Sequence, residues 1–77
     1  MNKERKNRIM DVKEILGNAV DELEDIRAGE EMAMENIPEN LQNSEKYALM
    51  EDAVDALEDA YGSVSDAIDS LDEILEM

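Results

Sequence analysis

The sequence predicts an all-α protein: an antiparallel hairpin of two long helices, at about residues 4–34 and 44–76, that dimerises into a four-helix bundle or coiled coil. Apolar residues recur at alternating spacings of three and four in both segments, which is the heptad pattern of packed helices. The connection between them, residues 36–43, is short, and long helices joined by a short connection run antiparallel. We expect a single domain over residues 1–77, since a chain of this length holds no more.

The first segment shows the heptad spacing over most of its length. Its apolar positions are Ile9, Val12, Leu16, Ala19, Leu23 and Ile26, with Ile15 and Val20 widening the stripe. Gly29 lies near the end of this segment, and a glycine inside a helix costs about 1 kcal/mol relative to alanine. We therefore expect fraying or a bend at Gly29.

Residues 36–43, with the sequence NIPENLQN, are predicted to form the turn. Pro38 cannot continue a helix whose preceding amides are hydrogen-bonded, but it suits the first turn of a new helix. We expect a short helical turn at residues 38–41, capped by Asn36, with Ile37 and Leu41 covering the end of the core. Ser44 is the predicted N-cap of the second helix.

The second segment carries the clearest pattern. Its heptad positions are Tyr47, Met50, Val54, Leu57, Tyr61, Val64, Ile68, Leu71 and Leu75, and a second file of Ala53, Ala60, Ala67 and Ile74 runs beside them. One partner helix covers only part of so wide an apolar face. We therefore predict a homodimer whose contact uses Ala53, Val54, Ala60, Tyr61, Ala67, Ile68, Ile74 and Leu75.

The chain is strongly acidic, with 22 acidic against 7 basic side chains and a formal charge of -15. Such a charge opposes direct binding to nucleic acid or to an anionic membrane and favours a basic partner. Among proteins with basic surfaces, those that handle nucleic acid are the largest class. Four of the basic residues lie within residues 1–8. In an antiparallel hairpin this basic start lies beside the acidic end of the second helix, which holds Asp69, Asp72, Glu73 and Glu76.

Catalysis and tight metal binding are not predicted. The sequence has no cysteine and no histidine, so it lacks the commonest metal ligand and the commonest general base at neutral pH. It has no EF-hand loop and no Glu-x-x-His pair, and we predict no catalytic residues, no cofactor and no dedicated metal site. Weak calcium binding by surface carboxylates stays open.

Every charge after Lys46 is negative, and this defines the predicted partner-binding face on the second helix. Its residues are Asp52, Asp55, Glu58, Asp59, Asp66, Asp69 and Asp72. Carboxylates repeated every three to four residues lie about 5 to 6 Å apart along a helix, a spacing comparable to the phosphates of a nucleic-acid strand. Imitation of DNA is one interpretation, and a solvated face that keeps a small protein in solution is the other.

No apolar run approaches the length of a membrane span or of a signal-peptide core. We therefore expect a soluble, intracellular protein.

The segment NIPENLQNSEKYALMEDAVDALEDA, residues 36–60, resembles a group of small acidic helical proteins encoded by prophages and mobile elements of gut-type bacteria. That group has the turn N-[ILM]-P-E-[NS]-L-Q-x-S-E followed by an acidic, alanine-rich helix. The resemblance covers the turn and most of the second helix. It implies a hairpin fold and a mobile-element setting, in which small acidic proteins often look like anti-CRISPR or other anti-defence inhibitors, and it supplies no catalytic residue.

Two functions follow as hypotheses. The first is a non-enzymatic inhibitor that docks its acidic face on the basic nucleic-acid channel of a host protein, such as a CRISPR effector. The second is a structural or assembly protein that oligomerises or binds partner helices through its apolar heptad positions. Salt dependence of binding distinguishes the two, because only the first depends on charge.

Overall fold

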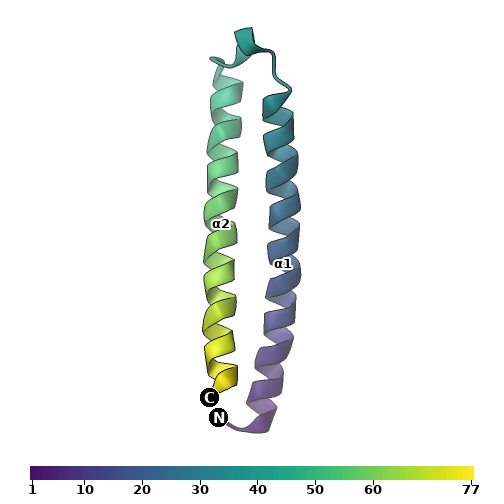
Figure 1. The fold of residues 1–77 in the computed structure, drawn as a ribbon, viewed down its shortest axis with the longest axis vertical. Helices are drawn as coiled ribbons and strands as arrows, with labels where there is room; N and C mark the ends of the chain where they lie inside the picture. Colours follow the sequence, from purple (N-terminus) through teal and green to yellow (C-terminus); the bar gives the residue numbers. More distant parts are fainter.

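The computed structural model describes residues 1–77 and consists of two long helices joined by a short turn (Figure 1). Helix α1 spans Lys3–Glu35, a 3₁₀ helix η1 spans Glu39–Leu41, and helix α2 spans Glu45–Glu76. The helices run antiparallel and side by side, so the molecule measures 59 × 14 × 14 Å. The predicted all-α hairpin is confirmed, and each helix boundary lies within one residue of its predicted position.

Side-chain caps fix where both helices begin. The Ser44 hydroxyl accepts a hydrogen bond from the Tyr47 amide over 3.2 Å, as predicted for the N-cap of α2. The Asn2 side chain does the same for α1, where Oδ1 accepts from the Arg5 amide over 2.8 Å. Asparagine directly before a helical segment is a common N-cap, so Asn2 could have been predicted from the sequence as the cap of α1.

The turn differs from the prediction in two details. Asn36 does not cap η1; it ends α1, with its amide donating to the Met32 carbonyl over 3.1 Å, and Pro38 is the residue that precedes η1. The residue before a proline avoids the helical region, which explains why α1 stops here. Leu41 is 50% exposed and so does not cover the end of the core, whereas Ile37 is half-buried.

Helix α1 also continues unbroken to Glu35, so the expected fraying at Gly29 is wrong. Packing of α1 along the whole length of α2 outweighs the intrinsic cost of one glycine.

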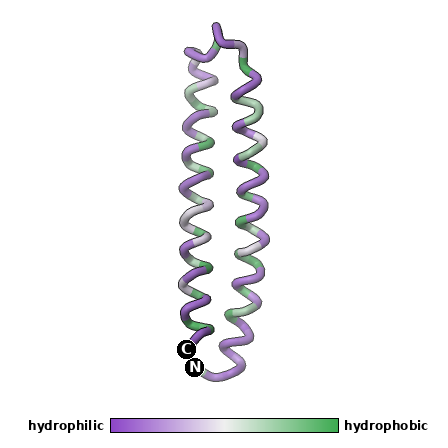
Figure 2. Tube along the Cα trace, in the orientation of Figure 1, coloured by the Kyte–Doolittle hydropathy of each residue, from purple (hydrophilic) through white to green (hydrophobic).

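The contact between the helices is thin. Figure 2 shows apolar residues recurring along both helices between hydrophilic ones. Only Val20 and Val54 are buried, with 9% and 7% of their surface exposed, and the other inward residues are half-buried. Two packed helices cannot enclose a core from all sides, which is why so few side chains are withdrawn from water.

The inward face of α1 is rotated relative to the prediction. Ile9, Leu16 and Leu23 face α2 as expected, but the file beside them is Lys13, Val20 and Arg27. Val12 and Ile26, predicted to pack inward, are 46% and 48% exposed. Both files flank the same central residues. The inward file holds the buried Val20, and its two cations, Lys13 and Arg27, lie beside acidic side chains of α2.

The basic start of α1 and the acidic end of α2 lie side by side, as predicted, because both termini are at the same end of the hairpin (Figure 1). Lys13 forms an ion pair with Asp72 across this end. The four basic residues of positions 1–8 form no ion pair. Neither helix carries an apolar stretch of the kind that a membrane crossing requires.

Candidate interaction surfaces

The outer side of α2, turned away from α1, is lined by carboxylates. Asp52, Asp59 and Asp66 follow one another at intervals of seven residues, and Asp55 and Asp69 lie beside them. All five side chains are exposed, and none takes part in an ion pair. We refer to these five residues as the acidic face.

The other two residues of the predicted partner-binding set lie at the edge of α2 next to α1. Asp72 pairs with Lys13, and Glu58 Oε1 lies 4.0 Å from Arg27 Nη1. The charges of Glu58 and Asp72 are therefore partly neutralised within the hairpin, unlike those of the acidic face.

Glu73 extends the acidic face, although it was not in the predicted set. It is exposed and follows Asp66 by seven residues, in the same file as Asp52 and Asp59. The heptad spacing of the aspartates was the signal that predicts its position.

Arg27 is the centre of the main ion-pair cluster. Its side chain is 19% exposed, and it donates hydrogen bonds to Glu24 and to Glu31 on the same helix. These hydrogen bonds raise the pKa of the Arg27 guanidinium and lower the pKa of the Glu24 carboxyl. The cluster lies on the same side of the hairpin as Lys13 and Asp72, so we call this side the ionic flank.

The opposite side of the helix contact is apolar. Val12 and Leu71 line one surface hollow together, which Arg5 and Arg8 also line near the start of α1, whereas the next residue on each helix, Lys13 and Asp72, belongs to the ionic flank. Successive residues of a helix are about 100° apart. Val12 and Lys13 therefore lie on opposite sides of the helix contact, and so do Leu71 and Asp72. We call this side the apolar flank; its residues are Val12, Ile15, Ala19 and Ile26 of α1 and Leu49, Ala53, Ala56, Ala60, Ala67 and Ile74 of α2.

The residues predicted for the oligomer contact divide between two locations. Val54 is buried, and Ile68 and Leu75 are half-buried on the face of α2 that packs on α1. Tyr61 belongs to the same heptad file and is 37% exposed. The alanine file and Ile74 instead lie on the apolar flank, namely Ala53, Ala60, Ala67 and Ile74.

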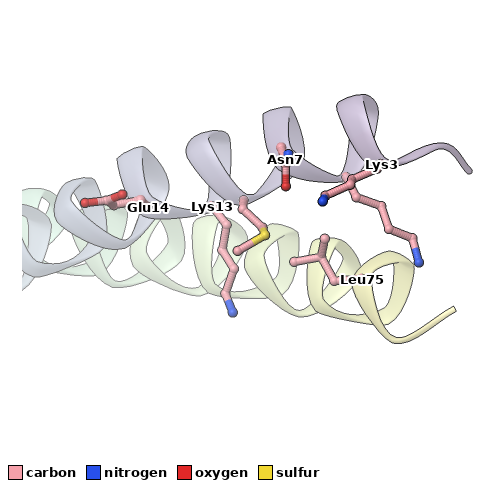
Figure 3. Close-up of a pocket in the computed structure, with 7 residues that line it drawn as sticks. Lys3, Asn7, Lys13, Glu14 and Leu75 are labelled. Atoms are coloured by element: carbon pink, nitrogen blue, oxygen red, sulfur yellow. The ribbon is translucent and has the colours of Figure 1, made fainter.

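A hollow of about 550 Å³ opens at the end of the hairpin that holds both termini. Figure 3 shows Leu75 of α2 below Lys3 and Asn7 of α1, with the Lys13 side chain reaching down beside it and Glu14 pointing away from Leu75. Three lysines line this hollow, counting Lys6, together with one carboxylate, that of Glu14.

No three carboxylates gather closely enough to hold a metal ion. Comparison of the chain with protein-family models, with curated proteins and with solved structures gave no match.

Proposed function

We propose that the protein is a non-enzymatic interaction module whose acidic face binds a basic, nucleic-acid-binding surface of another protein. The observation that carries the proposal is the set of five exposed, unpaired carboxylates on the outer side of α2. Like charges three or four residues apart destabilise a helix. A basic partner neutralises these carboxylates, so the loss of their mutual repulsion adds to the free energy of binding.

The dimensions of the acidic face suit this role. Asp52 and Asp69 are 17 residues apart in the sequence, so the face is about 25 Å long at about 1.5 Å per residue. A channel that holds a nucleic-acid strand presents lysines and arginines to a row of phosphates. The same cations meet the carboxylates of α2, and the charge of -15 speeds their encounter with the protein.

The biological setting of the proposal comes from the resemblance of residues 36–60 to proteins of prophages and mobile elements. In that setting the protein is a phage-encoded or element-encoded inhibitor, of anti-CRISPR or DNA-mimic type. It acts in the cytoplasm of a bacterial host, and its target is a nucleic-acid-handling protein such as a CRISPR effector.

The test is capture from host lysate on immobilised protein, with elution first by duplex DNA and then by salt. A protein held by the acidic face is released by DNA, because both compete for the same cations, and its binding weakens steeply as salt rises. The double variant Asp55→Lys/Asp59→Lys should lose most of the captured protein.

The matched control is Asp11→Lys/Asp25→Lys, which changes the net charge equally but on exposed positions of α1. It should retain the captured protein. Equal loss in both variants would mean that only the total charge matters, and capture resistant to both DNA and salt would count against the proposal.

The apolar flank favours a second function, an assembly module that binds a helix through apolar contact. Val12, Ile26 and Leu49 are all largely exposed on this side. Substitution of Ala60 by phenylalanine should then abolish binding, whereas charge reversal on the acidic face should change it little.

A further inference from the structure

We propose that the apolar flank is the docking surface for a second copy of this chain, packed antiparallel to the first so that the two α1 helices pair about Ala19. The inference is independent of any partner of the acidic face, because the two surfaces lie on different sides of the hairpin.

The exposed area of the hairpin indicates a missing contact. One chain exposes 5756 Å². A compact monomer of 8.7 kDa exposes about 4,700 Å², so the hairpin has an excess of roughly 1,000 Å². A standard protein interface buries about 800 Å² on each partner. One interface on each chain therefore accounts for the excess.

The apolar flank is the surface that fits such an interface. The ionic flank is occupied by the Lys13–Asp72 pair and by the Arg27 cluster, and the outer side of α2 is acidic. Val12, Ile15 and Ile26 point to the apolar flank without a covering element, and Ile15 is 66% exposed. Burying these side chains gains hydrophobic free energy, and Arg8 and Glu22, each seven residues from Ile15, place one cation and one carboxylate on the same side of α1.

The residue spacing on α1 is symmetric about its middle. Ala19 is the central residue of the helix Lys3–Glu35, and Val12 and Ile26 lie seven residues to either side. In an antiparallel pair of α1 helices, Val12 therefore meets the partner's Ile26, and Ala19 meets the partner's Ala19. The small alanine at the centre lets the two backbones approach closely, and the larger pairs fill the space on both sides.

The charge distribution selects the antiparallel orientation. The half of the hairpin nearer the turn, residues 20–60, has fourteen acidic and two basic side chains, a formal charge of -12, and the remaining residues have eight and five, a formal charge of -3. Parallel packing would place the two strongly acidic halves against each other. Antiparallel packing places each against the weakly charged half, where repulsion is smaller. It also brings Arg8, eleven residues before Ala19, opposite the partner's Glu30, eleven residues after it.

Cysteine cross-linking tests both the surface and the orientation, and the natural chain has no cysteine to interfere. Ala19→Cys should form a disulfide-linked dimer on mild oxidation, because the symmetry axis brings its two copies together. Val12→Cys alone should not, since its two copies are about 21 Å apart along the helix axis at 1.5 Å per residue. A mixture of Val12→Cys and Ile26→Cys chains should cross-link to each other.

Light scattering on the unmodified protein provides the second measurement. The expected mass at micromolar concentration is close to twice the 8.7 kDa of one chain. Val12→Glu/Ile26→Glu should halve that mass and keep the helical circular dichroism, because both side chains are exposed in the single hairpin. Met10→Glu/Met32→Glu, which adds the same two charges at exposed positions away from the flank, should leave the mass unchanged.

Each contrary outcome overturns the proposal. A monomeric mass for the unmodified protein excludes the second copy. Self-cross-linking of Val12→Cys without cross-linking of Ala19→Cys excludes the antiparallel orientation. A dimer that survives Val12→Glu/Ile26→Glu excludes the apolar flank.

Discussion

Arg27 and Glu24, one turn apart on α1, are joined by two hydrogen bonds: Nε donates to Oε2 over 3.2 Å and Nη2 donates to Oε1 over 2.7 Å. The same guanidinium donates to Glu31 and lies 4.0 Å from the Glu58 carboxylate of α2. This one cation therefore has three carboxylates around it, two on its own helix and one on the other. In a chain with 22 acidic side chains, such a cation locally offsets repulsion between carboxylates.

The Arg27–Glu24 pair predicts a pH-dependent stability difference. Hydrogen bonding to Arg27 lowers the pKa of Glu24 in the folded state. A lowered folded pKa stabilises the fold above the unfolded pKa of about 4.3, and this stabilisation is lost as pH falls through the folded pKa. Thermal unfolding followed by circular dichroism should give Glu24→Gln a lower Tm than the natural protein at pH 7, with the gap closing in acid.

The control for this prediction is Asp25→Asn, which removes one exposed carboxylate that has no ion-pair partner. Its Tm at pH 7 should equal or exceed that of the natural protein. If both variants shift equally, the paired geometry of Glu24 has no effect on stability.

Added salt should stabilise the protein. The formal charge of -15 on a hairpin only 14 Å across two of its axes produces repulsion that unfolding relieves. The screening length falls from about 30 Å at 0.01 M to about 10 Å at 0.1 M ionic strength, so Tm should rise across this range. A fall in Tm would show that ion pairs such as Lys13–Asp72 outweigh the general repulsion.

Val54 should be among the positions where truncation costs most, since it is the most buried residue at 7% exposure. Val54→Ala removes methyl groups from the centre of the helix contact and should lower the free energy of unfolding by about 2 kcal/mol in urea titration. Met32→Ala, at a 64% exposed position, should change it by less than about 0.5 kcal/mol. Similar costs for the two variants would contradict the observed burial.

Replacing Gly29 or Gly62 by alanine should stabilise the fold. Both lie inside helices, and a Cβ added at either has no atom within 4 Å. Each substitution should raise the free energy of unfolding by about 0.5 to 1 kcal/mol, because alanine loses less backbone entropy on folding. Ala48→Gly, at an exposed position of α2, should lower it by a similar amount. A loss on Gly62→Ala would reveal a contact of this position with another chain.

The sequence predicted the hairpin well because its signals agree with one another. The three-four spacing, the proline in the turn and the Ser44 cap all favour the same boundaries. The rotation of α1 was not predictable in this way. Val12 and Lys13 both neighbour the central file, and pattern reasoning places the apolar residue inside. In the structure Lys13 is half-buried, with its ammonium group paired with Asp72, and Val12 is 46% exposed.

The acidic face was predictable in part. Helical spacing alone places Asp52, Asp59 and Asp66 on one side of α2, whichever way the helix packs. The separation of Glu58 and Asp72 from this face depends on where Arg27 and Lys13 lie on α1. That placement requires the register between the helices, which a pattern within one helix does not contain.

The thin helix contact bears on how such a chain changes over evolutionary time. Val20 and Val54 are the only buried residues, so strict steric selection acts on very few positions. Elsewhere the fold requires only a class of residue at a given spacing, and exposed substitutions usually change stability by less than about 0.5 kcal/mol. Related hairpins can therefore diverge in residue identity while keeping the spacing of apolar and acidic positions. That spacing is the feature by which distant relatives would be recognised.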